Sequence, residues 1–300
     1  MSDQDEQPED EAAERVDDVE GGLVGLGVEQ VELHYGVATD VGLVRRVNED
    51  SCLADPPVFV VADGMGGHDG GDIASRIVVE EFARLADVGY DPRRGSHVVL
   101  STLRAAQRRL LEYGATHRGS EGGAWHGGTT TVVAMLVEGD DGPLWLLTNL
   151  GDSRIYRFTH GELLRVSTDH SVVQGLVDSG RITEEQALRH PERHIVTRAL
   201  GGPDPLDPDF FELPLADAER VLLCSDGVTD LVRDPEIARI LGENTDPRDA
   251  AERIVTAALE AGGIDNATAV VVDVMGLVDD RTYDSRRQRE SLHEKLGALP

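Results

Sequence analysis

Residues Val58–His68, VFVVADGMGGH, are the stretch that decides the fold. The β-branched, apolar run over 58–61, bounded by Pro57 and by the glycines that follow, predicts a short buried strand. Asp63 stands at the mouth of this strand, and Gly64 begins a glycine-rich loop that can pass close to a ligand. The alternative is an ordinary Asp-Gly turn, which is common and holds no ligand.

The same pattern recurs along the chain. Asp226 and Asp152 each follow an apolar run, and Asp265 shortly precedes another. Carboxylates at the rims of buried strands, with no cluster of sulfur or imidazole among them, favour a hard cation such as Mg²⁺ or Mn²⁺. Without metal, these like charges would repel one another. The sequence therefore predicts a polynuclear Mg²⁺ or Mn²⁺ site.

Composition limits the classes of function. The chain has 300 residues, of which 40% are hydrophobic, so it can bury a substantial core. The formal net charge of −29 argues against nucleic acid and against anionic membrane surfaces as partners. No apolar run approaches the roughly 18 residues that span a bilayer, and the amino terminus has no signal-like region. Cys52 and Cys224 are expected to be reduced, buried thiols in a cytoplasmic protein.

The expected organisation is one globular domain between two polar tails. Residues 1–30 carry many acidic side chains against the single Arg15, which predicts an acidic disordered tail. The domain is expected over 31–276, and a charged tail over 277–300. Within the domain, the polar segment 169–202 is expected to leave the core and to gate substrates.

Helical spacing and short apolar runs predict the elements of this domain. The predicted strands cover 32–39, 58–61, 128–137, 144–149, 154–158, 162–166, 209–213, 220–225 and 267–274. The predicted helices cover 72–86, 97–113, 235–241 and 247–261, with short helical patterns at 172–177, 184–188 and 195–200. Hairpin turns at 140–142 and 159–161 favour antiparallel sheets. The fold class is therefore α+β, with antiparallel sheets packed together and helices outside.

A charged segment precedes the first predicted site residue. Arg45 lies a few residues before Glu49 and Asp50. One interpretation is a surface ion-pair cluster, which contributes little to stability. The other gives Arg45 the task of binding a phosphate with its planar guanidinium, while Asp50 adds to the metal shell through water.

These motifs carry a resemblance to a known family. In order they are Arg45 with Asn48-Glu49-Asp50, Asp63-Gly64-Met65-Gly66-Gly67-His68, Gly151-Asp152-Ser153-Arg154, Cys224-Ser225-Asp226-Gly227 and Gly263-Ile264-Asp265-Asn266. They resemble the bacterial metal-dependent serine/threonine protein phosphatases of type 2C, the PPM family, over the whole globular region. The segment 180–201 resembles the flap of that family. The resemblance implies a four-layer αββα sandwich, with two central antiparallel β-sheets flanked by helix pairs and metals in a cleft at one end.

The resemblance also implies roles for individual residues. Asp63 would bridge two Mn²⁺ or Mg²⁺ ions, with the carbonyl of Gly64 on one of them. Asp226 and Asp265 would complete the shell of the other, and Asp152, with Asp226, matches the position of a third, weaker metal. Arg45 would bind the substrate phosphate. The implied reaction is direct attack on phosphorus by a hydroxide that bridges the two ions, without a phosphoenzyme and without a cysteine nucleophile.

Several points stay open at this stage. Met65 stands where many eukaryotic members have a histidine, so the acid for the leaving alkoxide is either His68 or a metal-bound water. The expected partners are phosphorylated proteins and serine/threonine kinases, and we expect a monomer. The alternatives to an active phosphatase are a catalytically silent binding module and an acidic, metal-buffering scaffold. The physiological substrate, the metal used in the cell and the role of the acidic tail are not encoded in these motifs.

Overall fold

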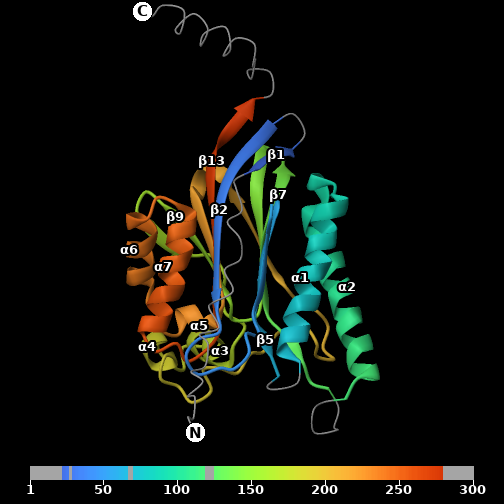
Figure 1. Cartoon of the computed structure of the whole chain (residues 1–300), viewed down its shortest axis with the longest axis vertical. Helices are drawn as coiled ribbons and strands as arrows, with labels where there is room; N and C mark the ends of the chain where they lie inside the picture. The colour runs from blue at the N-terminus through green and yellow to red at the C-terminus, as the bar shows by residue number, and fades with distance from the viewer. Residues whose placement is uncertain (1–21, 27–28, 67–69, 119–124, 280–300) are drawn as a thin grey trace, which may run out of the picture.

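The computed structural model describes residues 22–26, 29–66, 70–118 and 125–279. Two antiparallel sheets form the centre of the molecule (Figure 1). In spatial order, the first contains β1 (Gly22–Leu26), β2 (Glu29–Asp40), β13 (Ala267–Asp279), β12 (Arg220–Cys224), β9 (Arg154–Thr159) and β10 (Glu162–Arg165). The second contains β11 (Asp209–Pro214), β8 (Gly142–Leu150), β7 (Thr131–Gly139), β4 (Val58–Ala62) and β3 (Ser51–Asp55). A short pair, β5 (Gly64–Met65) and β6 (Gly128–Thr129), lies at one end.

The two sheets share a core because side chains alternate across each strand. On β4, Phe59 and Val61 face the other sheet and join a core cluster that contains Trp145 of their own sheet and Val221 of the facing sheet. Val60 on the same strand points the opposite way and packs beneath helices. Burial on both faces explains why this strand appears in the sequence as a continuous apolar run and not as an alternating one.

Helices cover the outer face of each sheet (Figure 1). α1 (Gly71–Val88) and α2 (Gly95–Thr116), the latter preceded by a 3₁₀ turn at Pro92–Arg94, share a core cluster with β4, β7 and β8. α6 (Asp234–Glu243) and α7 (Pro247–Glu260) pack on β12 and β13. A 3₁₀ turn, Leu215–Asp217, precedes β12, and a short α5 (Asp226–Thr229) follows this strand. The predicted four-layer αββα sandwich is confirmed.

The structure corrects the expected domain boundaries. β1 begins at Gly22, so the predicted start at residue 31 is too late, and β13 continues to Asp279, beyond the predicted end at 276. Strand pairing uses backbone groups, so β1 pairs with β2 although it follows an acidic segment. Residues 1–21, 27–28 and 280–300 of the predicted tails lie outside the described residues.

One predicted helix is wrong. The segment 195–200 is not helical, because Val196 forms a β-bridge with Ser171 and Leu200 forms one with Thr129. The other two short helices of this region are confirmed as α3 (Val172–Asp178) and α4 (Glu184–Ala187). The whole segment 169–202 leaves the sheets after β10 and returns before β11. We call it the flap.

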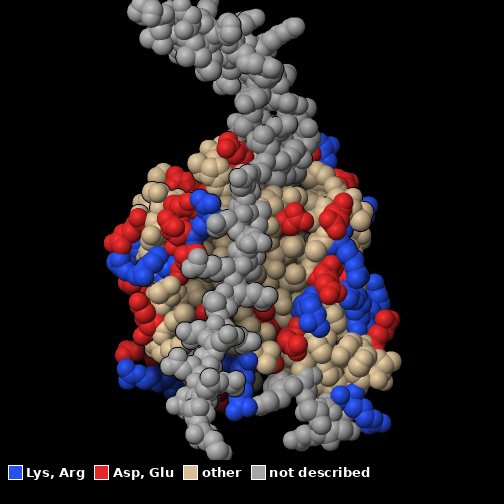
Figure 2. Space-filling model, in the orientation of Figure 1, with Lys and Arg blue, Asp and Glu red and all other residues tan. Residues whose placement is uncertain are grey.

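Charged residues on the outer helices pair locally. Arg109 contacts Glu80 and Glu81 between α2 and α1, and Arg239 contacts Glu236 within α6. Figure 2 shows acidic and basic side chains side by side along both flanks. The Arg239 pair is exposed, and exposed pairs contribute little to stability. Among the described residues, no helix has both the length and the apolar composition needed to cross a membrane.

Candidate metal centre

The four predicted acids meet at one end of the sandwich. Asp63 follows β4, Asp152 follows β8, Asp226 opens α5 directly after β12, and Asp265 lies two residues before β13. This end is the lower one in Figure 1, where β5, α3 and α5 gather. Because each acid stands next to a buried strand, the rigid sheets hold its carboxylate in place.

Close backbone approaches define the loops that carry these acids. A Cβ at Gly227 would collide with the carbonyl oxygen of Asn266, and one at Gly64 would collide with the carbonyl oxygens of Gly71 and Glu49. The side chain of Asn266 ties the loops together: its amide donates to the carbonyl oxygens of Val41, at 2.9 Å, and Val47, at 3.0 Å. These glycines therefore serve backbone packing around the acids.

The site concentrates negative charge. Burial raises the pKa of Asp63 well above the usual range of a carboxyl, and four further acids raise it more: Asp226, Asp50, Asp152 and Asp265. Burial, followed by the charges of Asp152 and Asp230, raises the pKa of Asp226 in the same direction. A cation bound among these carboxylates would relieve both the desolvation and the repulsion.

Asp50 is a further, buried acid of this cluster. The hydroxyls of Ser225 and Thr268 donate to its Oδ2 at 2.8 and 2.7 Å. Burial raises its pKa to about 6, although these two hydrogen bonds lower it. One carboxylate oxygen is thus engaged by the protein, and the contribution of Asp50 to the metal shell through water stays a prediction. The two hydroxyl residues were not predicted from the sequence, although Ser225 directly precedes Asp226.

Arg45 stands at the rim. Its Nη2 lies 2.7 Å from Oδ2 of Asp265, and its Nη1 lies 3.8 Å from Oε2 of Glu49. The side chain is 45% exposed, so the guanidinium is open to a ligand while one edge holds Asp265. The ion pair and the phosphate-binding role are therefore compatible, since the planar fork carries donors on more than one edge.

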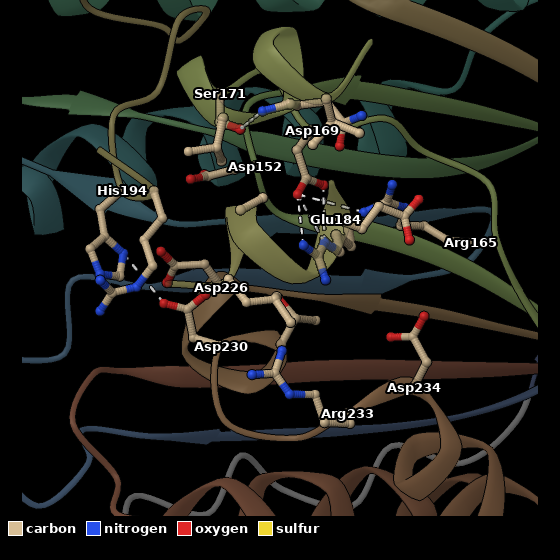
Figure 3. A pocket seen from close by; sticks show the side chains of 18 of the residues that line it. Asp152, Arg165, Asp169, Ser171, Glu184, His194, Asp226, Asp230, Arg233 and Asp234 are labelled. Atoms are coloured by element: carbon tan, nitrogen blue, oxygen red, sulfur yellow. Dashed lines mark hydrogen bonds and ion pairs between the residues drawn. The ribbon is translucent and has the colours of Figure 1, made fainter. Parts of the chain in front are cut away.

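A cavity of about 530 Å³ opens beside Asp152 and Asp226, between the flap and α5 (Figure 3). Arg154 and Asp169 form one wall, where Nη2 and Oδ2 are 2.7 Å apart. Asp152 is nine-tenths buried, and burial, with the charge of Asp169, raises its pKa to about 7. The cavity gives a substrate or an ion access to the carboxylates from the flap side.

The donor set fits hard divalent cations. Asp63, Asp226 and Asp265 offer carboxylate oxygens and Gly64 offers a carbonyl, which are the ligands that Mg²⁺ and Mn²⁺ prefer. Among the described residues, no lysine or arginine forms an ion pair with Asp63 or Asp226, so their charges are not neutralised by the protein. His68, one of the two candidate acids for the leaving group, lies outside the described residues.

Comparison with known proteins identifies the family. The profile of protein phosphatase 2C matches residues 45–261. The chain belongs to the protein phosphatase 2C family. The predicted family is confirmed, and the motif residues Arg45, Asp63, Asp152 and Asp226 all lie within the matched segment, whereas Asp265 lies just after it.

Bacterial members of the protein phosphatase 2C family are similar over most of the chain. The serine/threonine protein phosphatase PstP of Mycobacterium tuberculosis is 39% identical over 243 residues, which cover 81% of this chain but 45% of PstP. The chain thus spans about half the length of that relative. The serine/threonine phosphatase stp of Listeria monocytogenes is 30% identical over 256 residues, covering 80% of this chain and 96% of that protein.

Solved structures of the family agree with the fold. A crystal structure of M. tuberculosis PstP/Ppp is 36% identical and covers 82% of this chain and 100% of that one, with a TM-score of 0.71. A structure of the PstP catalytic domain in complex with two manganese ions is 34% identical and covers 82% of this chain and 99% of that one, with a TM-score of 0.66. Metal dependence is general in this family.

Proposed function

We propose that the protein is a metal-dependent phosphatase that hydrolyses phosphoserine and phosphothreonine in proteins. One observation supports this proposal above all: the half-buried Asp63 and Asp226 form no ion pair with a lysine or arginine of the described residues, and the exposed Arg45 contacts Asp265 of the same cluster. The carboxylates suit divalent cations, and the guanidinium suits a phosphate. A cation bound beside a guanidinium is the arrangement that phosphoryl transfer uses to neutralise developing charge.

Different residues of the chain would bind the cations, orient the water and bind the phosphate. Asp63, with the carbonyl of Gly64, would hold a pair of cations, and Asp226 and Asp265 would complete their coordination. Asp50 would orient a coordinated water from below. Arg45 would bind two phosphoryl oxygens and place phosphorus at the cations. When bound, the cations would lower the pKa of a water that attacks phosphorus.

Further parts of the proposal come from the family and from its solved members. Two core ions, Mn²⁺ or Mg²⁺, are proposed because the PstP catalytic domain binds two manganese ions, and Asp152 with Asp226 would hold a third. Phosphorylated proteins would be the substrates, and serine/threonine kinases the opposing enzymes. We also predict a monomeric, cytoplasmic protein. The predicted location rests on Cys52 and Cys224, which are free thiols.

The two alternatives receive no support from the site. A silent binding module would be expected to lack a metal acid or Arg45, and all of these are present. A metal-buffering scaffold would not need Arg45 beside Asp265, at 2.7 Å.

The test is hydrolysis of a phosphothreonine peptide with and without Mn²⁺. We expect Mn²⁺-dependent phosphate release that Asp63→Asn abolishes, because the carboxylate that joins the ions is lost. Arg45→Ala should raise KM by about 10–100-fold, the range for a charged hydrogen-bonded contact, whereas Arg46→Ala, an exposed neighbour, should behave as wild type. No release by folded, Mn²⁺-loaded protein would contradict the proposal.

A further inference from the structure

Large apolar side chains are exposed on two loops at the edge of the metal centre. Leu43, Val44 and Val47 are 71%, 66% and 57% exposed on the loop between β2 and β3, and Ile264 is 46% exposed on the loop before β13. Among the described large apolar side chains, only Val88 is more exposed than Leu43 and Val44. A single exposed apolar residue is common at a protein surface, but a group of them at one place indicates a surface that contacts a partner. We call the four loop residues the apolar patch.

Hydrogen bonds bring the two loops of the apolar patch together. The amide of Leu43 donates to the carbonyl oxygen of Gly263 at 2.7 Å, and a Cβ at Gly263 would lie 2.9 Å from Cγ of Leu43. Leu43 therefore lies against the residue that precedes Ile264. The side-chain amide of Asn266 donates to the carbonyl oxygen of Val47 at 3.0 Å. Because each loop is held by the other, the apolar patch is a preformed surface.

The apolar patch is continuous with the proposed phosphate-binding position. Val44 directly precedes Arg45, and Ile264 directly precedes Asp265. Nη2 of Arg45 lies 2.7 Å from Oδ2 of Asp265, so an apolar residue stands next to each member of this ion pair. A phosphoryl group bound by Arg45 would therefore lie beside the patch.

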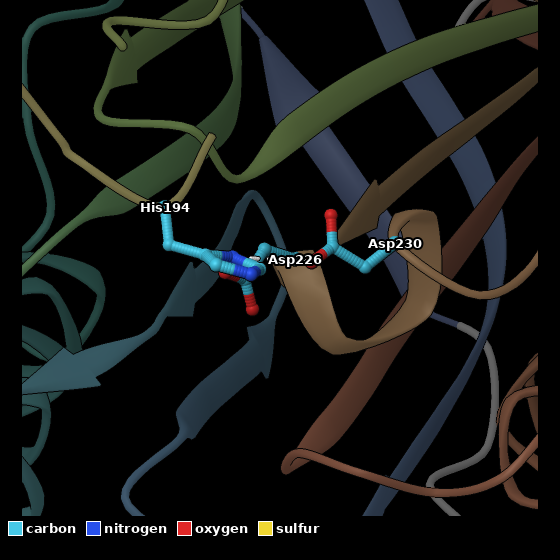
Figure 4. Close-up of side chains that lie close together, drawn as sticks. All are labelled: His194, Asp226 and Asp230. Carbon is cyan, nitrogen blue, oxygen red and sulfur yellow. Dashed lines mark ion pairs between the residues drawn. The ribbon is translucent and has the colours of Figure 1, made fainter. Parts of the chain in front are cut away.

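The flap side of the metal centre is charged instead. His194, Asp226 and Asp230 each present one ligand atom, and these three atoms all lie within 4.8 Å of one another (Figure 4). Most of the other residues that line the cavity there are charged or polar, with Asp152 and Asp169 among them (Figure 3). Burial of an apolar side chain is favourable against apolar atoms. The patch and the flap side therefore offer different surfaces to a substrate.

We propose that the apolar patch binds an apolar side chain of the substrate phosphoprotein, two residues from the phosphorylated serine or threonine. The inference rests on the proposed function and names the class of sequence on which it acts. In an extended chain, side chains two residues apart point to the same face and lie about 7 Å apart. A phosphorylated residue that reaches Arg45 therefore directs the side chain two positions away towards the same surface of the enzyme.

Two other occupants of the apolar patch fit the chain less well. A second copy would bring together two chains with a formal net charge of −29 each, so like charge opposes the contact. The chain's own residues 1–21 carry many acids and, as large apolar residues, only Met1, Val16 and Val19. These acids would approach the carboxylates of the metal centre, which repel them.

The test compares kcat/KM of the Mn²⁺-loaded full chain for three phosphothreonine peptides. One peptide has serine at both positions two residues from the phosphothreonine, and each of the others has leucine at one of these positions. Wild type should prefer one leucine peptide over the serine peptide by about 10-fold, the lower end for burial of a leucine side chain. Equal values for all three peptides would overturn the inference.

A double variant shows whether the apolar patch carries the preference. Leu43→Ser combined with Ile264→Ser should reduce the ratio between the two peptides to about twofold or less, because the apolar area is lost. This ratio does not change when catalysis is lowered uniformly. Val88→Ser is the matched control, since Val88 ends α1, whose first residue, Gly71, lies at the loop of Gly64. It should keep the wild-type ratio, and a ratio that survives in the double variant would overturn the inference.

The same variants identify the other occupants. A double variant that hydrolyses the serine peptide faster than wild type would assign the apolar patch to the chain's own residues 1–21. A wild-type dimer in sedimentation experiments that the double variant dissociates would assign the patch to a second copy. Either result would overturn the inference.

Failure of the proposed function is distinguishable from failure of this inference. If folded, Mn²⁺-loaded wild type hydrolyses none of the peptides, the proposed function is contradicted, and peptide affinities measured by fluorescence anisotropy decide the inference instead. Tighter binding of one leucine peptide, lost in the double variant, would support it, and equal affinities would overturn it. Hydrolysis of all three peptides with equal kcat/KM would overturn this inference alone.

Discussion

The two ends of the β12–β13 strand pair hold buried charge in opposite ways. At one end, Arg220 stands directly opposite Asp273 in the sheet register. Its Nε and Nη2 donate to the two carboxylate oxygens of Asp273 at 2.6 and 2.7 Å, and its Nη1 donates to the carbonyl oxygens of Leu241 and Asn244. At the other end, Asp226 follows β12 and Asp265 precedes β13, and both face further acids.

The difference separates charged residues that stabilise this fold from charged residues that are placed to bind a ligand. Arg220 and Asp273 are both buried, and each charge meets its opposite with its hydrogen bonds filled. Asp226 is half-buried, but it faces only like charge and His194. Breaking the first pair should lower the free energy of unfolding. The acids at the other end should lower it in the metal-free wild type, and cation binding should raise it again.

Asp273→Ala should have the largest effect on folding. It leaves the Arg220 guanidinium buried without its carboxylate, which lowers the free energy of unfolding by about 3–5 kcal/mol. Chemical denaturation of wild type and variant measures the loss. Activity per folded molecule should stay near wild type, because Asp273 lies at the end of the β12–β13 pair that is opposite to the candidate metal ligands. A loss of activity without a loss of stability would break the comparison.

Asp265→Asn should give the opposite result. It removes one cation ligand and the partner of Arg45, so kcat/KM for a phosphothreonine peptide should fall by about 10²–10³-fold, as for loss of one preorganised electrostatic group. The free energy of unfolding without metal should not fall. Steady-state kinetics and denaturation of the same preparation check both statements, with Asp140→Asn in the exposed hairpin turn as the control.

The pH dependence of the metal-free protein sharpens the comparison further. Burial raises the pKa of Asp50 to about 6 and of Asp152 to about 7 from 3.8, so the folded state binds these protons more tightly than the unfolded state. Their contribution is therefore complete below about pH 4 and is lost as pH rises through 6 to 7. Without metal, Tm should fall across this range, by about 2–4 °C for each kcal/mol lost.

The dependence on pH can be assigned by a variant. Asp152→Asn removes one of the two titrations, so the fall of Tm with pH should be shallower in this variant than in wild type. Scanning calorimetry in the presence of a chelator measures both. A Tm that rises between pH 4 and 7 by the same amount in both proteins would show that the site carries no such cost.

Cys224→Ala should have the smallest effect. Burial raises the pKa of the Cys224 thiol to about 12, so almost no thiolate is present at neutral pH. We expect kcat to stay within about threefold of wild type, since the only lost atom is a small buried sulfur. Loss of all activity, or rapid inactivation by a thiol-alkylating reagent, would instead indicate a cysteine nucleophile.

The acids of the site could be found from the sequence because each stands beside an apolar run. The strand 58–62 and Asp63 are adjacent in the chain, so local pattern alone places the carboxylate at a strand end. The same holds for Asp152, Asp226 and Asp265. The layers could also be predicted, since helical spacing and hairpin turns are local signals.

Long-range pairing could not be predicted in this way. Arg220 and Asp273 are far apart in the chain, and only the register of β12 with β13 brings them together. His194 reaches Asp230 because of the path of the flap. The apolar spacing over 195–200 predicted a helix there, so it gave no guide to that path. A partial signal did exist for Asp230, which lies four residues after Asp226 on a helical turn.

The most direct test of this account compares the thermal stability of wild type and Asp63→Asn with and without Mn²⁺. In chelator, Asp63→Asn should have the higher Tm, because one buried, repelling carboxylate is gone. In Mn²⁺ at about 100 times its Kd, wild type should gain about 2.7 kcal/mol, and the order of the two Tm values should reverse. A wild type that is more stable than Asp63→Asn in chelator, or that gains nothing from Mn²⁺, would contradict the claim that these acids are held together for cations.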